Sequence, residues 1–269
     1  MPNVKIISSV SFRIPVILIA LISSALCSPS LMSVDCTSDY IELNTQAGID
    51  SFQSAYGGGG TCDTVPGTIR IGGPDVVDLT PLSALTTIHD QFQIRQTNNL
   101  TDLSGLSALT SVGGDQTNAA GSLYIFDNTA LASLHGLSGL TSIGGTLDIS
   151  DNPVLANLDG LSVLKSAGGI AIWNNDALTD ITGLSAVIIG NFPGAIAVGG
   201  NDALTNLDAL SSLTFVGGLS ITHNYALTNV DGLSSLTAVG QSLDIRSNTA
   251  LTDITGLSSL ASVGGYLQF

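Results

Sequence analysis

Apolar and polar positions along this chain follow a pattern that returns at a fixed interval. From Ile69 to Phe269 a phrase of 23 or 24 residues recurs, and it reads G-G-x-L-x-I-x-x-N-x-A-L-T-x-L-x-G-L-S-x-L-T-x-V. Two apolar residues separated by one position place both side chains on one face of a strand. Each copy therefore predicts a short strand with two inward side chains. The predicted pairs are Ile69/Ile71, Phe92/Ile94, Leu123/Ile125, Leu147/Ile149, Ile170/Ile172, Ile196/Val198, Leu219/Ile221, Leu243/Ile245 and Leu267/Phe269.

The rest of the phrase predicts how the chain returns to start the next strand. An asparagine follows the second inward residue by three positions, and its amide can bond the backbone of a turn or of a neighbouring coil. A second side follows, as in Ala250–Leu257, and breaks at a glycine. A third piece such as Leu236–Val239 ends at Gly240, where we expect a positive φ. The asparagines, expected to stack as an internal ladder, are Asn128, Asn152, Asn175, Asn201, Asn224 and Asn248.

No single coil can bury its own apolar face, so stacking has to create the core. The expected fold is an all-β, right-handed solenoid of about nine coils, the last one cut short, on the order of 40 Å long. Two intervals are irregular: 31 residues from Phe92 to Leu123 and 26 residues from Ile170 to Ile196. We expect the extra residues, Asp115–Ala120 and Ile189–Pro193, to bulge as loops.

Residues 1–27 have the features of a secretory signal. Lys5 and Arg13 precede the apolar run Ile14–Ala25, and cleavage is expected after Ala25 or Cys27. The alternative is an uncleaved anchor, although the run is shorter than the roughly 20 residues that span a bilayer. Leu26 also disfavours lipid attachment at Cys27. The chain is therefore expected to be secreted or at the cell surface, with no membrane span after cleavage.

An oxidising compartment favours a disulfide between Cys36 and Cys62. These cysteines bracket Tyr40–Gly60, a segment without the repeat that we expect to cap the first coil with a short strand and a helix. The predicted division is a signal at 1–27, a cap at 28–66 and the solenoid at 67–269. At the other end, either Phe269 covers the last coil or the chain is a truncated product. That open coil is a candidate site for a partner or for self-association.

Charge excludes one class of partner. The chain has six lysines and arginines against 21 acidic residues, and the predicted signal holds two of the six. Nucleic acid is excluded because phosphate binding needs clustered cations. Nearly all of the acid is aspartate, which favours turns, so we expect it at the corners.

The recurring phrase, together with the cysteine-bracketed segment, resembles receptor L-domain-like repeats, which are related to leucine-rich repeats. The resemblance covers roughly residues 36–269. It implies a surface binding or cell-envelope role and names no ligand, because the matching residues are those that build coils.

Candidate chemistry is sparse. His89, His135 and His223 occupy three different positions of the coil, and no nucleophile motif is present. We therefore expect no enzyme activity, no catalytic residues, no cofactor and no metal site. Calcium remains an open alternative for two aspartate sets, although the sets alternate between coils. They are Asp159, Asp208 and Asp231, with Asp102, Asp180 and Asp253 two positions earlier in their coils.

Outward strand positions are the better candidates for recognition, because the core does not dictate them. Tyr124, Phe126 and Trp173 fall on one face within two coils, in a chain that is poor in aromatic residues. Exposed aromatic side chains of this kind suggest a patch that binds protein or glycan. Arg95 and Arg246 are the charged candidates on the same face. The expected function is a non-catalytic recognition or adhesion module for an unknown surface protein or glycan.

Two other classes of function remain as alternatives. A structural cell-envelope protein would use only the solenoid's shape. An ice-binding protein would use columns of threonine, such as Thr179 and Thr205 or Thr110 and Thr141. In a eukaryote, Asn99 would be a glycosylation site, since Asn99-Leu100-Thr101 is a sequon.

Overall fold

The computed structural model describes residues 35–113, 121–189 and 194–269. Residues Ser33–Phe269 form one compact unit. The predicted signal at 1–27 and the predicted bulge Asp115–Ala120 lie outside the described residues, as does the predicted bulge Ile189–Pro193 except for Ile189, which ends β12.

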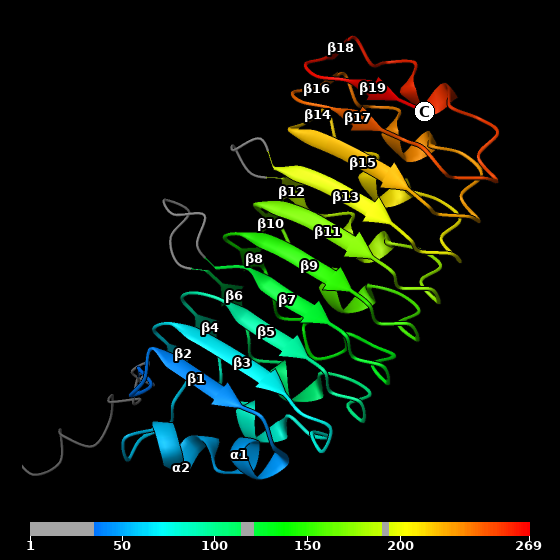
Figure 1. Cartoon of the computed structure of the whole chain (residues 1–269). Helices are drawn as coiled ribbons and strands as arrows, with labels where there is room; N and C mark the ends of the chain where they lie inside the picture. Colours follow the sequence, from blue (N-terminus) through cyan, green and yellow to red (C-terminus); the bar gives the residue numbers. More distant parts are fainter. Residues whose placement is uncertain (1–34, 114–120, 190–193) are drawn as a thin grey trace, which may run out of the picture. The chain divides into compact units, whose positions relative to one another are not determined.

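One parallel sheet of ten strands runs the length of this unit, with its strands side by side in sequence order (Figure 1). Neighbouring strands are in register at the predicted inward pairs: Ile125 lies beside Ile94 and Ile149. Nine strands come from the recurring phrase, so the predicted coils are confirmed, and β1 is added by the cap. The strands are β1 (Tyr40–Leu43), β3 (Thr68–Gly72), β5 (Phe92–Arg95), β7 (Leu123–Phe126), β9 (Thr146–Ser150), β11 (Gly169–Trp173), β13 (Ala195–Gly199), β15 (Gly218–Thr222), β17 (Leu243–Asp244) and β19 (Leu267–Gln268).

Two-residue strands form a second side of the coils, in two parallel sheets. The first sheet has the order β12-β10-β8-β6-β4-β2 and the second has the order β14-β16-β18. The break between them falls at the irregular 26-residue coil. These strands are β2 (Thr64–Val65), β4 (Thr87–Ile88), β6 (Ser111–Val112), β8 (Ser142–Ile143), β10 (Ser166–Ala167), β12 (Ile188–Ile189), β14 (Phe215–Val216), β16 (Ala238–Val239) and β18 (Ser262–Val263).

The remaining side carries short 3-10 helices. Leucines three positions apart, such as Leu155, Leu158, Leu161 and Leu164, are all fully buried here. Backbone bonds between residues three apart, from Leu161 N to Leu158 O and from Leu164 N to Leu161 O, both at 2.9 Å, repeat the geometry of a 3-10 helix and direct these leucines into the core. The helices are η1 (Thr80–Leu82), η2 (Ser104–Leu106), η3 (Asp159–Leu161), η4 (Thr182–Leu184), η5 (Asp208–Leu210), η6 (Asp231–Leu233) and η7 (Thr255–Leu257).

The core is a single apolar cluster that extends through the stacked coils. The predicted asparagine ladder forms beside it. Asn175 has no exposed surface, and its Nδ2 donates to Ile149 O at 3.0 Å and to Asn201 Oδ1 at 3.2 Å. Its Oδ1 accepts from the backbone N–H of Asn152 at 3.2 Å. The ladder therefore satisfies the polar backbone where each coil turns away from the sheet.

The strained backbone lies elsewhere than predicted. Gly240 does not have a positive φ, although Gly113 at the equivalent corner does, at +88°. Positive φ instead recurs at the residue just before each ladder asparagine, and also before Thr97, whose hydroxyl donates to the first ladder residue, Asn128. These residues are Gln96, Asp127, Asp151, Asn174, Gly200, His223 and Ser247. Most of them are polar side chains that tolerate this conformation better than branched ones.

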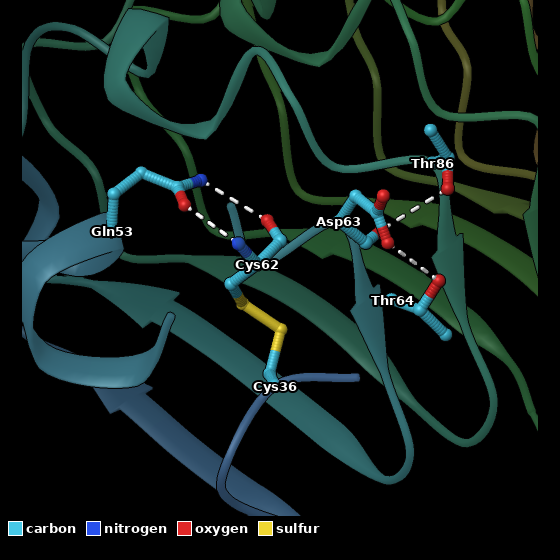
Figure 2. The surroundings of a disulfide bond; sticks show 6 residues. All are labelled: Cys36, Gln53, Cys62, Asp63, Thr64 and Thr86. Atoms are coloured by element: carbon cyan, nitrogen blue, oxygen red, sulfur yellow. Dashed lines mark hydrogen bonds between the residues drawn. A yellow bond between two sulfur atoms is a disulfide. The ribbon is translucent and has the colours of Figure 1, made fainter. Parts of the chain in front are cut away.

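The cap at the first coil contains the predicted disulfide. Cys36 and Cys62 are joined with their Cα atoms 4.9 Å apart (Figure 2). The Gln53 side chain holds both backbone groups of Cys62: Nε2 donates to its carbonyl at 3.1 Å, and its N–H donates to Oε1 at 2.8 Å. Helices α1 (Gln46–Asp50) and α2 (Phe52–Tyr56) bury Ile49 and Phe52 against the core.

The last coil is not covered by Phe269, which is 57% exposed. Leu267 of β19 is likewise 52% exposed, whereas its counterpart Leu243 one coil earlier is fully buried. Coverage by Phe269, one of the two alternatives for this end, is therefore not what the structure has.

Candidate ligand-binding face

The candidate residues lie on the outer side of the ten-stranded sheet, which we call the outward face. It is formed by the side chains that alternate with the buried ones along β1 to β19. Tyr124 and Phe126 project from β7, and Trp173 projects from β11, with β9 between them. Phe126 is in register with Ser150, and Ser150 with Trp173, so the two rings belong to one row. The three aromatic side chains are half-buried rather than fully exposed.

Trp173 has a defined seat on the neighbouring strand. Its register partner on β13 is Gly199, and a Cβ added there would lie 2.1 Å from the indole Cζ3. The two ring atoms bonded to Cζ3 would be 2.6 and 2.8 Å away, so the six-membered ring lies across the Cβ direction. The indole therefore occupies the space that a side chain at position 199 would need. Glycine at that position allows the ring to pack against the sheet.

Asp148 on β9 lies between Tyr124 and Ala171 in register. Ser150 donates its hydroxyl to Asp148 Oδ1 at 2.8 Å. Burial raises the pKa of Asp148 above its ordinary value, and the Ser150 hydrogen bond opposes that shift. The centre of the outward face thus keeps a partly desolvated carboxyl group beside its aromatic side chains.

A raised folded-state pKa has a defined consequence for stability. The folded protein favours protonated Asp148. Stability therefore decreases as pH rises from the pKa of Asp148 in the unfolded chain through its higher pKa in the folded protein. We expect Asp148→Asn to remove this loss and to raise Tm at neutral pH by about 1–3 °C, with no gain at pH 3. Thermal unfolding of both proteins at pH 3 and pH 7 measures the difference. An equal change at both pH values would contradict this assignment.

Three arginines also lie on the outward face. Arg95 Nη2 is 4.0 Å from Glu42 Oε1, a long contact that crosses the strand carrying Gly72. Arg246 Nε is 3.2 Å from the nearly buried carboxylate of Asp244. Both guanidinium groups remain partly exposed.

Arg70 is the arginine that the sequence did not single out. Its Nη1 donates to Tyr40 Oη at 2.8 Å, and its guanidinium lies 5.3 Å from the centre of the same ring. Tyr40 belongs to the cap strand β1. Because the cap has no copy of the repeat, the pairing of β1 with β3 could not be predicted from it. After residue 27 the chain has four basic residues, Arg70, Arg95, Lys165 and Arg246. All except Lys165 are on the outward face.

One of the two aspartate columns caps turns with its carboxylates, and at the other column an asparagine is the cap. Where the first position is aspartate, it accepts from the N–H two residues later: Asp180 Oδ1 accepts from Thr182 N at 3.0 Å. Where the second position is aspartate, the first is asparagine, as in Asn206 and Asp208. Two carboxylates therefore never share one turn, which explains the alternation between coils. Among the described residues, no group of three or more histidine, cysteine, aspartate or glutamate side chains is placed to hold a metal ion.

The same caps shift two pKa values downward. The Ser104 side chain, followed by its N–H, lowers the pKa of Asp102. The Thr255 N–H, followed by its hydroxyl, lowers the pKa of Asp253. These carboxylates favour the folded state at neutral pH, and that contribution decreases as pH falls through their folded-state pKa values.

Threonine hydroxyls of both columns bond back to the solenoid. Thr141 Oγ1 donates to Thr110 O at 3.0 Å, and Thr205 Oγ1 donates to Thr179 O at 3.4 Å. Each hydroxyl thus continues the bonding between coils. Asn99, the residue of the sequon, is exposed, and its Nδ2 donates to Pro74 O at 2.6 Å.

Comparison with known proteins agrees with this geometry. Residues 61–166 match the Receptor L domain family. This stretch is receptor L-domain-like. The matched residues include β3, β5, β7 and β9, so the match covers four of the ten strands of the outward face, with Tyr124 and Phe126 among them. No curated protein matches the chain.

The receptor L-domain-like classification has consequences for function. Receptor L domains are non-catalytic binding domains, so the match indicates a ligand-binding, receptor-type module. Together with the Cys36–Cys62 disulfide, it indicates an extracellular or cell-surface protein. Within residues 35–113, 121–189 and 194–269, no helix has the length and apolar character to cross a membrane.

Proposed function

We propose that this protein is a secreted or cell-surface recognition module, and that it binds a surface protein or glycan through its outward face. The observation that carries the proposal is a concentration of scarce residue types. The single tryptophan, Arg70 and Arg95 project from strands of one sheet, and Arg246 follows β17 of that sheet by two residues, so three of the four basic residues after position 27 lie on this side. Neither type is required by the core, which is built from leucine, isoleucine and valine.

The outward face also differs from the other surfaces of the coil. The first positions of the short second-side strands are mostly serine, threonine or alanine, with Ile188 and Phe215 as exposed exceptions, and the corners carry aspartates. Aromatic side chains and arginine are enriched at binding surfaces: aromatic rings provide a large contact area with few torsions to fix, and arginine provides a planar group with several hydrogen-bond donors. Tyr124, Phe126, Trp173, Arg95 and Arg246 are therefore the proposed ligand-binding residues.

The proposal is tested by replacing Tyr124, Phe126 and Trp173 together with alanine. We expect binding to cell-surface preparations to fall at least about tenfold, because aromatic anchors dominate interface energies. Pull-down followed by quantitative immunodetection measures it. The matched control is Phe215→Ala, which removes a 52% exposed ring from the second side. Unchanged binding by the triple variant, with an intact fold, contradicts the proposal.

The alternative functions lack a supporting contact. The threonine hydroxyls that would order ice donate to carbonyl groups of adjacent coils, as Thr110 does to Thr86 O at 3.0 Å. A purely structural role would leave every outward position free to vary, yet Gly199 is matched to the ring of Trp173.

A further inference from the structure

The six-membered ring of Trp173 is fixed in position before any ligand binds, and it offers a flat surface on which a ligand can pack. Contact with Gly199 supports the six-membered ring from the side of the sheet. The side chain remains half-buried, so part of the ring is open to solvent. An aromatic ring fixed before binding loses little conformational entropy when a ligand packs on it.

The neighbours of this ring are small or polar. Ala171 and Ala197 are the outward residues between the buried pairs of β11 and β13. Ser150 and the carboxyl group of Asp148 lie on β9. In the described part of the outward face between β5 and β17, no large aliphatic side chain is exposed. Anchors of a protein interface normally lie in fully desolvated pockets, whereas the rings on this surface are half-buried and lie beside hydroxyl and carboxyl groups.

We propose that this part of the outward face, from Phe126 on β7 to the Trp173 ring over β13, binds a neutral, β-linked polysaccharide that runs across the strands. This inference rests on the proposed function and names its ligand class. The C–H face of a pyranose ring packs on an aromatic ring through dispersion and loss of hydration. Its hydroxyl groups donate to carboxylates and accept from serine, threonine and arginine side chains.

Spacing supports the orientation of the glycan. Neighbouring strands lie about 4.8 Å apart, so Phe126 and Trp173 are based about 10 Å apart. One sugar unit of an extended β-linked chain has nearly the length of one strand spacing. Three successive sugar units can therefore lie over β7, β9 and β11, one on each strand, and a fourth reaches the Trp173 ring over β13. The chain's net charge of −15 disfavours acidic polymers.

The lone tryptophan makes the test direct, because its fluorescence reports only on this site. Titrations of the full chain use β-1,4-linked oligosaccharides of glucose, N-acetylglucosamine, xylose and mannose, from dimers to hexamers. We expect one series to change the emission, with affinity rising at least about tenfold from dimer to tetramer and then levelling off. Malto-oligosaccharides, which are α-linked and curved, are the matched control and should not bind.

Gly199→Ala tests whether binding depends on the position of the Trp173 ring, because the variant retains the ring but moves it. The added Cβ moves the indole away from its position on β13, while Trp173 itself is retained. We therefore expect a shifted emission spectrum, and an affinity for the oligosaccharide at least about tenfold weaker by calorimetry. Gly218→Ala is its control, because a Cβ there would be 3.7 Å from the nearest atom. If Gly199→Ala binds the oligosaccharide as tightly as Gly218→Ala does, the assignment of the glycan site to the Trp173 ring is wrong. If no oligosaccharide binds while the triple alanine variant still loses surface binding, the glycan class is wrong and a protein ligand is indicated. Unaffected surface binding in the triple variant contradicts the proposed function itself.

Discussion

Replacing Asn175 with alanine is expected to destabilise the solenoid by about 3–6 kcal/mol, because several buried polar groups lose their partners together. Asn175 is fully buried, and its amide donates to Ile149 O, Trp173 O and Asn201 Oδ1. Its oxygen accepts from Asn152 on the preceding coil. Each unsatisfied buried group costs on the order of 1–3 kcal/mol, and alanine restores none of these bonds.

Chemical denaturation measures this change, with Asn98→Ala as the matched control. Asn98 is exposed and accepts one bond from Thr129 Oγ1 at 3.3 Å, so its replacement should change stability by no more than about 0.5 kcal/mol. A loss below about 1 kcal/mol in Asn175→Ala would show that the ladder contributes little. Failure of Asn175→Ala to fold, with Asn98→Ala folded, agrees with the expectation.

Removal of the disulfide is expected to have the next largest effect. The Cys36→Ser and Cys62→Ser double variant should lose about 3–4 kcal/mol, since the bond closes a separation of 26 residues. Residues of the cap, including Phe52 and Ile49, cover the apolar end of the first coil. Loosening the cap would therefore expose the core where the stack begins.

Thermal unfolding with and without a reducing agent measures the contribution of the disulfide. Reduced wild-type protein should unfold at the temperature of the double variant, and the reducing agent should not affect the double variant. Equal Tm values for oxidised wild-type protein and the variant would contradict a stabilising role. The contacts of Gln53 with both backbone groups of Cys62 would then be sufficient to hold the cap.

Most of the fold could be predicted from the repeat, because every coil contains the same pattern of inward apolar residues. Alternation such as Leu147, Ile149 defines the inward side of a strand, and the parallel register follows once identical coils stack. The 3-10 helices were not predicted, because alternation does not reveal a side on which leucines such as Leu155, Leu158 and Leu161 are three positions apart. Cysteine bracketing predicted the cap correctly.

Details of the candidate site depend on contacts that a repeat does not contain. The contact between Trp173 and Gly199 depends on the direction in which the indole leans, which the pattern of the repeat does not specify. Pairing of Arg70 with Tyr40 joins the repeat to a cap segment that has no copy of it. Asp148 stood at an outward position, but its partial burial depends on neighbouring strands.

Oxidative footprinting of the aromatic side chains, with and without bound cell-surface ligand, tests the central claim most directly. All the rings are compared within one molecule, so no variant has to fold. We predict that ligand protects Tyr124, Phe126 and Trp173 from oxidation and leaves Phe215 and Tyr225 unchanged. Protection of Phe215 or Tyr225, with Tyr124, Phe126 and Trp173 still fully reactive, would contradict recognition through the outward face.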